Sequence, residues 1–176
     1  MSELYLVIPT LEHKQDAMEY RRECLENDYW VPGGHIHGSG SLNQYENYED
    51  WLDKTEKEIH NKNPNLVPAT VYFAIHNGKI VGTIQIRHYL NETLLIRGGH
   101  IGYGVRPSER RKGYATKMLK LALDECKKLN ITKALVTCDK NNIASSKTIQ
   151  KCGGVLENEF IDDGGGITLR YWIKIT

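Results

Sequence analysis

Three consecutive cations followed by a glycine form the segment of this chain best suited to hold an anion. The segment consists of Arg110, Arg111, Lys112, Gly113, Tyr114, Ala115 and Thr116. It separates a predicted strand, residues 99–106, from a predicted helix, residues 113–129, so the free N–H groups and positive end of that helix point to the place where the cations gather. The glycine has no Cβ and lets a ligand come close to the main chain. The pattern is typical of a phosphate or pyrophosphate site, and a solvated basic turn that caps a helix is the alternative.

Composition narrows the class of protein. The chain has 176 residues, a formal net charge of +1 and 26% charged residues, which indicates one globular domain, residues 1–176. Broad affinity for nucleic acid or anionic membranes would need a larger basic excess. No apolar run approaches the roughly 20 residues that span a bilayer, and the acidic start does not resemble a signal peptide. We therefore expect a cytoplasmic protein without nucleic-acid or membrane partners, and a homodimer remains open.

Histidines and cysteines offer little evidence for a metal or redox site. His35 and His37 form an H-x-H pattern, but no third or fourth ligand is evident, so we expect a substrate loop and no metal. The four cysteines are widely spaced and include no CxxC motif. Reduced, buried thiols are the expected state.

The elements that position the basic loop follow from residue patterns. Residues 91–97 form either a helical turn or an irregular connector. The remaining elements are a strand at 3–8, a helix capped by Thr10 and ending at 27, a helix at 42–60 with a Ser41–Gln44 capping box, a hairpin around Asn77-Gly78, the strand and helix described above, a strand at 132–138, a helix at 144–152, and strands at 155–161 and 167–175. The order β-α-α-β-β-β-α-β-α-β-β predicts a mixed α/β fold with a central sheet of about seven strands and helices on both faces. The strands before and after the helix at 113–129 should be parallel.

Two motifs in this order resemble the GNAT superfamily of acetyl-CoA-dependent N-acetyltransferases. Arg110-x-x-Gly113-x-Ala115 is similar to the superfamily's pyrophosphate motif, Gln/Arg-x-x-Gly-x-Gly/Ala, and it lies after a strand and opens an amphipathic helix. Asn142 and Ser145, followed by Gly153, resemble the segment that leads from the fifth strand into the next helix. The resemblance covers residues from about 69 to 176 well.

The resemblance implies a GNAT-like fold that binds acetyl-CoA as a cosubstrate. The fourth and fifth strands would splay apart around the pantetheine arm, which the main chain of Tyr103, Gly104 and Val105 would bind like an added strand. Residues 110–116 would hold the pyrophosphate, mainly through backbone N–H groups and the Thr116 hydroxyl. Asn142 and Ser145 would contact the arm at the other wall.

Two positions depart from the superfamily pattern. The tyrosine that often protonates the leaving thiolate falls at Ile149, which cannot donate a proton. The phenylalanine that usually follows the glycine falls at Gly154.

Candidate side chains for the transfer lie near the predicted fourth strand. His100 is the candidate general base, because an imidazole titrates near neutral pH; a solvated histidine at the start of a strand is the alternative. Tyr103 is a candidate acid or a core residue. Candidate contacts for the acceptor are Arg87, Tyr89, Tyr45 and His37.

The predicted function is an N-acetyltransferase that moves an acetyl group directly from acetyl-CoA to a primary amine of a small molecule or peptide. A non-catalytic acyl-CoA-binding module is the alternative, favoured by Ile149. The absence of a G-x-x-x-x-G-K-[ST] pattern argues against a nucleotide-dependent phosphotransferase.

Overall fold

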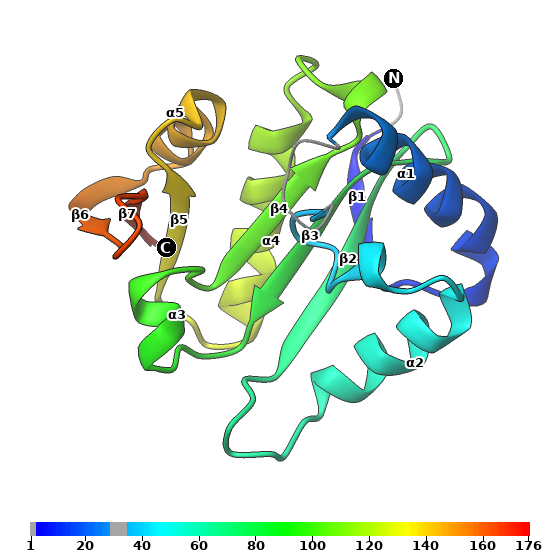
Figure 1. Cartoon of the computed structure of the whole chain (residues 1–176), viewed down its shortest axis with the longest axis horizontal. Helices are drawn as coiled ribbons and strands as arrows, with labels where there is room; N and C mark the ends of the chain where they lie inside the picture. The colour runs from blue at the N-terminus through cyan, green and yellow to red at the C-terminus, as the bar shows by residue number, and fades with distance from the viewer. Residues whose placement is uncertain (1–2, 29–34) are drawn as a thin grey trace.

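The computed structural model in Figure 1 describes residues 3–28 and 35–176. The predicted loop at 30–40 is therefore described only from residue 35 onward. Within these residues there is no helix long and apolar enough to cross a membrane.

The seven predicted strands are all present in the described part of the chain, but hydrogen bonds divide them into two groups. The first group has the order β1-β2-β3-β4 and the second β5-β7-β6, and every pair within a group is antiparallel. Their bounds are β1 Tyr5–Val7, β2 Ala69–His76, β3 Lys79–Arg87, β4 Ile101–Val105, β5 Lys133–Asp139, β6 Val155–Ile161 and β7 Ile167–Lys174. In Figure 1 the arrows of β4 and β5 point in the same general direction and move apart towards their tips.

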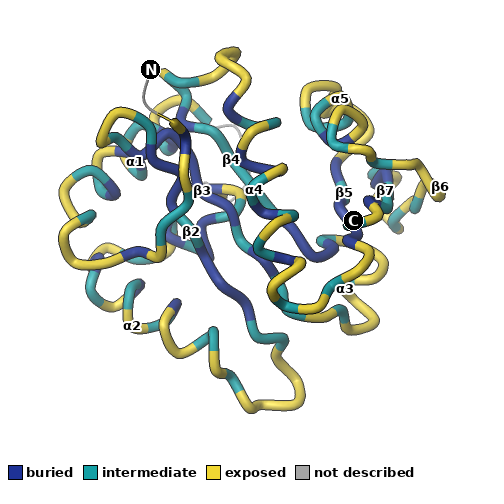
Figure 2. Tube along the Cα trace, turned by 180° about the vertical axis from the view of Figure 1, so that it is seen from behind, coloured by how far each residue is buried: buried dark blue, intermediate teal, exposed yellow. Residues whose placement is uncertain are grey.

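Two layers of helices cover the first sheet. The helices are α1 Lys14–Asn27, α2 Tyr48–Ile59, α3 Glu92–Ile96, α4 Tyr114–Lys128 and α5 Ile143–Lys151. On one face, α1 and α2 build a core that includes Tyr20, Trp51 and Phe73. On the other face, α4 packs Met118 against the sheet, while α5, which lies against α4 and β5, adds Ile149 to the same core. Figure 2 shows β2 and β3, the central strands of this sheet, as buried over most of their length.

The start of the second helix was predicted wrongly. A 3-10 turn spans Leu42–Gln44, and α2 begins only at Tyr48. Ser41 has a left-handed backbone and makes no side-chain cap, whereas Asn47 accepts the N–H of Glu49 at 2.9 Å. An asparagine at the N-cap position satisfies a free helical donor, so the helix starts there.

The hairpin around Asn77-Gly78 was predicted correctly, and its register decides which side chains share a face. Val71 lies opposite Gln85, and Val71 belongs to the α1–α2 core. Ile84 and Ile86 point to the α4 face instead. Both faces of β3 are therefore buried over most of its length. The ambiguous segment at 91–97 contains the short helix α3.

Candidate active site

The free edge of β4 is the feature around which the candidate site is built. Arg87 donates its main-chain N–H to the carbonyl of His100, and Arg106 donates its N–H to Val81, both at 2.8 Å. Antiparallel strands alternate between groups that face the partner and groups that face away. Even-numbered residues of β4 therefore pair with β3, while Ile101, Tyr103 and Val105 turn their main-chain groups towards β5.

This alternation refines the predicted contacts with an extended ligand. Tyr103 and Val105 present main-chain groups on the free edge, as an added strand would require. Gly104 faces Thr83 across the β3–β4 ladder, so its main-chain groups point away from the opening. The carbonyl of Val105 already accepts the Arg110 Nε–H at 3.3 Å.

The helix that follows β4 begins without a side-chain cap. Gly113 is its N-cap residue, with φ +80°, and the N–H groups of Tyr114, Ala115 and Thr116 meet no acceptor in the described part of the chain. A Cβ added to Gly113 would meet no atom of residues 3–28 and 35–176 within 4 Å. The main chain is thus open to solvent where the positive end of α4 points, as an anion site requires.

The three cations of the loop are not equivalent. Arg110 makes a two-pronged ion pair with Asp28, at the end of α1. Lys112 pairs with Glu109 at 2.8 Å. Arg111 has a left-handed backbone, with φ 63°, and among the described residues it makes no ion pair. Within the described residues Arg111 is thus without an ion-pair partner, while Arg110 ties the loop to the end of α1.

The side chains after the glycine are divided between core and opening. Tyr114 is buried, and its hydroxyl lies 2.9 Å from Nδ1 of His76 on β2. Ala115 and Thr116 stay partly exposed. The Tyr114 side chain therefore anchors the helix, and its predicted role at the pyrophosphate is confined to the main chain.

The start of α5 meets β4 through a side-chain contact. Asn142 caps α5 by accepting the Ser145 N–H at 3.0 Å. The Ser145 hydroxyl lies 2.8 Å from the hydroxyl of Tyr103, which reaches across from β4. Burial raises the pKa of Tyr103 to about 12, so the phenol keeps its proton at neutral pH. The structure thus brings together Tyr103, Asn142 and Ser145.

Ile149 lies one turn after Ser145, on the same helix. It is fully buried, and a Cβ added to Gly154 would come within 2.5 Å of its side chain. The two departures from the superfamily motif are therefore in direct contact. Two phenols reach α5: the Tyr103 hydroxyl lies 2.8 Å from that of Ser145, and the Tyr171 hydroxyl lies 2.7 Å from that of Ser146. Of the two, only Tyr103 comes from β4.

His100 has a setting that weighs against the predicted role of general base. Only 7% of the residue is exposed, and its Nδ1 accepts the N–H of Leu135 at 2.9 Å. Burial, together with the charge of Arg87, lowers the pKa of His100 to about 4. The lone pair of Nδ1 is occupied and Nε2 carries the proton of the neutral ring, so the imidazole has no free site to receive another.

The loop at 35–40 covers the face of β4 that α4 does not. The carbonyl of His37 accepts the Thr83 hydroxyl at 3.0 Å, and a Cβ on Gly104 would come within 2.8 Å of the same carbonyl. Gly38 has φ +73°, and a Cβ there would meet the carbonyl of Gly102 at 2.5 Å. The loop therefore lies directly on β4.

The His37 ring is exposed and packs edge to face against His35, with ring centres 4.7 Å apart. Partial desolvation and the neighbouring His35 lower the pKa of His37, so the ring is neutral at physiological pH. Its place beside β4 suits the predicted contact with an acceptor.

The other predicted acceptor contacts are dispersed. Arg87 is held by the carbonyls of Gly98 and Gly99 at 3.2 and 3.1 Å. Tyr89 lies beyond the end of β3 and is 49% exposed. Tyr45 packs against the α1–α2 core. The structure therefore gives Arg87 and Tyr45 packing and bonding partners of their own, and it leaves Tyr89 on the surface.

An ion-pair network at the end of β4 was missed in the sequence. Arg106 is 4% exposed and pairs with Asp16 and Glu23 of α1, both at 2.6 Å. The guanidinium outweighs partial burial and lowers the pKa of Glu23. The available signal was the spacing of the two carboxylates, seven residues apart on one face of a predicted helix.

Comparison with known proteins decides the family. The model of the acetyltransferase (GNAT) family matches residues 11–154. The chain belongs to this family. No curated protein sequence matches the chain significantly.

Solved structures share the acetyltransferase fold over nearly the whole chain. The microcin C7 self-immunity acetyltransferase MccE, solved with acetyl-CoA and AMP, has a TM-score of 0.72 and 17% identity, with 99% of this chain and 94% of that chain covered. A Salmonella typhimurium acetyltransferase that modifies the N-terminal serine of ribosomal protein L7/L12 has 0.69 and 16%, covering 100% and 97%. A spermidine N-acetyltransferase chimera derived in part from Vibrio cholerae has 0.66 and 16%, covering 98% and 96%.

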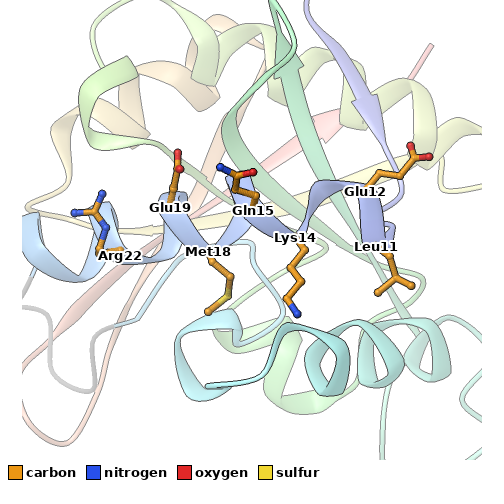
Figure 3. A pocket seen from close by; sticks show the side chains of 7 residues that line it. All are labelled: Leu11, Glu12, Lys14, Gln15, Met18, Glu19 and Arg22. Carbon is orange, nitrogen blue, oxygen red and sulfur yellow. The ribbon is translucent and has the colours of Figure 1, made fainter.

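Metal ligands are not gathered anywhere in residues 3–28 and 35–176: no group of three or more His, Cys, Asp or Glu side chains could hold an ion there. A shallow hollow of about 580 Å³ lies on the exposed side of α1 (Figure 3). Its lining residues are Leu11, Glu12, Lys14, Gln15, Met18, Glu19 and Arg22. None of them belongs to the candidate site.

Proposed function

We propose that this family member transfers the acetyl group of acetyl-CoA to a primary amine of a small molecule or peptide, as a single N-acetyltransferase domain. The observation that carries the proposal is a pair of features that follow each other in the chain: the free edge of β4, and then the N-terminus of α4, which has no side-chain cap. An extended arm with a pyrophosphate at one end matches this arrangement. The structures of MccE with acetyl-CoA and of the ribosomal protein acetyltransferase RimL with CoA support the choice of donor.

The proposed reaction forms a C–N bond and breaks a C–S bond in one ternary complex. The neutral amine attacks the thioester carbonyl, and the tetrahedral oxyanion is held by a main-chain N–H on the free edge of β4, for which Tyr103 and Val105 are the candidates. Collapse of this intermediate expels the CoA thiolate. Solvent in the opening receives the amine proton, because His100 has no free lone pair.

We assign protonation of the thiolate to Tyr103. Its hydroxyl lies 2.8 Å from that of Ser145, and its raised pKa keeps the phenol protonated at neutral pH. The phenol donates its proton as the C–S bond breaks, while Ser145 turns its own O–H towards the developing phenolate. Because a phenolate is a stronger base than a thiolate, it then regains a proton from solvent. This arrangement would take the place of the superfamily tyrosine that Ile149 replaces.

The test has a binding step and a turnover step. Calorimetry should show acetyl-CoA binding to the wild type, and ATP with Mg²⁺ should show none. A panel of amines should then release CoA thiol, detected with a thiol reagent and corrected for hydrolysis without acceptor. Spermidine and a peptide with an N-terminal serine represent the acceptors of two of the similar structures.

The competing proposal, a non-catalytic acyl-CoA-binding module, rests on Ile149. It predicts acetyl-CoA binding without thiol release for any amine in the panel. Failure to bind acetyl-CoA would reject both proposals.

A further inference from the structure

We propose that a junction of side chains holds β4 and β5 together at one point and thereby sets the opening for the pantetheine arm, with His100 as its positioning residue. The strand junction consists of Arg87, Gly98, Gly99, His100, Leu135 and Thr137. This inference rests on the proposed function, since it concerns the same opening. It gives the buried histidine a role other than that of a base.

The first part of the strand junction is a reciprocal pair of hydrogen bonds. The main-chain N–H of His100 donates to the carbonyl of Leu135 at 2.7 Å. In return, the N–H of Leu135 donates to Nδ1 of the His100 ring at 2.9 Å. In a regular ladder the second acceptor would be a main-chain carbonyl. Here the carbonyl of His100 is already bound by Arg87 of β3, so the imidazole takes its place.

A side chain again takes the place of a main-chain acceptor two residues earlier. The N–H of Gly98 donates to the hydroxyl of Thr137 on β5 at 3.0 Å. The N–H groups of Leu135 and Gly98 are thus both bound by side chains. Neither hydrogen bond requires the following residues of β4 to lie beside β5. A true ladder would pull the next residues together as well, and it would consume the groups of Ile101, Tyr103 and Val105 that face the opening.

Close backbone contact sharpens the turn at this point. Gly99 has φ +63°, and a Cβ there would come within 2.4 Å of the Leu135 carbonyl. The Arg87 guanidinium donates hydrogen bonds to the carbonyls of Gly98 and Gly99. These contacts fix the direction in which β4 leaves β5. The width of the opening further along is set by this angle.

The proposal predicts different effects on the binding of the two ends of acetyl-CoA. The pantetheine arm depends on the free edge of β4, whereas the nucleotide end depends on the loop at 110–116. Loss of the strand junction should weaken the binding of CoA. It should not change the binding of adenosine 3′,5′-bisphosphate, a probe that lacks the arm. A general loss of structure would weaken both.

The experiment measures both ligands by calorimetry on the full chain. His100→Leu removes the acceptor of Leu135, and we expect the Kd of CoA to rise about tenfold, which corresponds to about 1.4 kcal/mol. The Kd of adenosine 3′,5′-bisphosphate should stay within about twofold. His100→Asn is the matched control, because its side-chain oxygen can replace Nδ1, and it should restore CoA binding to within about threefold of the wild type.

Kinetics supply the readout that distinguishes positioning from proton transfer. For His100→Leu the KM of acetyl-CoA should rise more than kcat falls, and the acid limb of the rate profile should stay unchanged from pH 6 to 9. If His100→Leu does not fold, Thr137→Val removes the Gly98 acceptor with little change in volume and replaces it in the same measurements. The proposal would be overturned if the variant bound both ligands more weakly by the same factor, or if it bound both as tightly as the wild type. A wild type that binds no CoA would instead reject the proposed function.

Discussion

Gly113 begins α4 with a left-handed backbone, and its replacement tests the cofactor cradle directly. Among the residues that the structure describes, no atom lies within 4 Å of an added Cβ, so this part of the fold has room for a side chain. The backbone cost of a non-glycine residue at this φ is roughly 1–2 kcal/mol. Gly113→Asp also places a negative charge where two pyrophosphate charges should lie. At about 4 Å each repulsion costs about 1 kcal/mol even at the dielectric of water, and the sum of about 2 kcal/mol corresponds to roughly thirtyfold in Kd.

Gly153 provides a matched control for this change. It has φ +88°, and an added Cβ meets nothing within 4 Å, but it follows the C-terminal end of α5. Gly153→Asp should cost similar stability in urea unfolding and leave the Kd of acetyl-CoA within about threefold. Gly113→Asn separates bulk from charge, and only the Asp variant should recover affinity as added salt screens the repulsion. Calorimetry showing Gly113→Asp within threefold of the wild type would refute the cradle.

Three further changes test other parts of the site. Tyr103→Phe should lower kcat about a hundredfold, in the range of acid catalysis, with little change in the Kd of acetyl-CoA; unchanged steady-state thiol release would exclude the phenol as the acid. Arg106→Met should lower the free energy of unfolding by about 3 kcal/mol, because Asp16 and Glu23 lose their partner while partly buried; a loss below about 1 kcal/mol in urea titrations would contradict this. The pKa of His100 is about 4 in the folded chain and ordinarily 6.5. Because the folded chain binds this proton less tightly than the unfolded chain, the contribution of His100 to the free energy of unfolding is fully present above pH 6.5. It is lost as the pH falls to 4, by up to about 3 kcal/mol. His100→Asn should remove this part of the pH dependence, and parallel stability curves would show that the ring titrates normally.

Local patterns allowed most elements to be predicted. The Asn77-Gly78 turn, the stripe of α4 and the glycine that opens it depend on neighbours within a few residues. The same holds for Asn142, whose cap spans three residues. Gly113 and Asn142 also belong to the motifs that resemble the family, so the family could be predicted from the sequence.

Long-range partners explain what could not be predicted. The N–H that occupies the His100 ring comes from Leu135, and the carboxylates of Arg106 lie on the first helix. No pattern near His100 distinguishes a base from a buried acceptor, because the difference lies in a strand 35 residues away. The late start of α2 had a nearer cause, since Asn47 competes with Ser41 for the same capping role.

The ion pairs between α1 and the end of β4 have a consequence for exchanging parts between relatives. Arg106 forms ion pairs with Asp16 and Glu23, and Arg110 forms one with Asp28, so α1 with its C-cap residue and the segment after β4 depend on each other's charges. A chimera that imports the first helix of another acetyltransferase would leave a buried guanidinium without its partners unless those carboxylates came with it. The first helix and the segment after β4 would therefore have to be exchanged together.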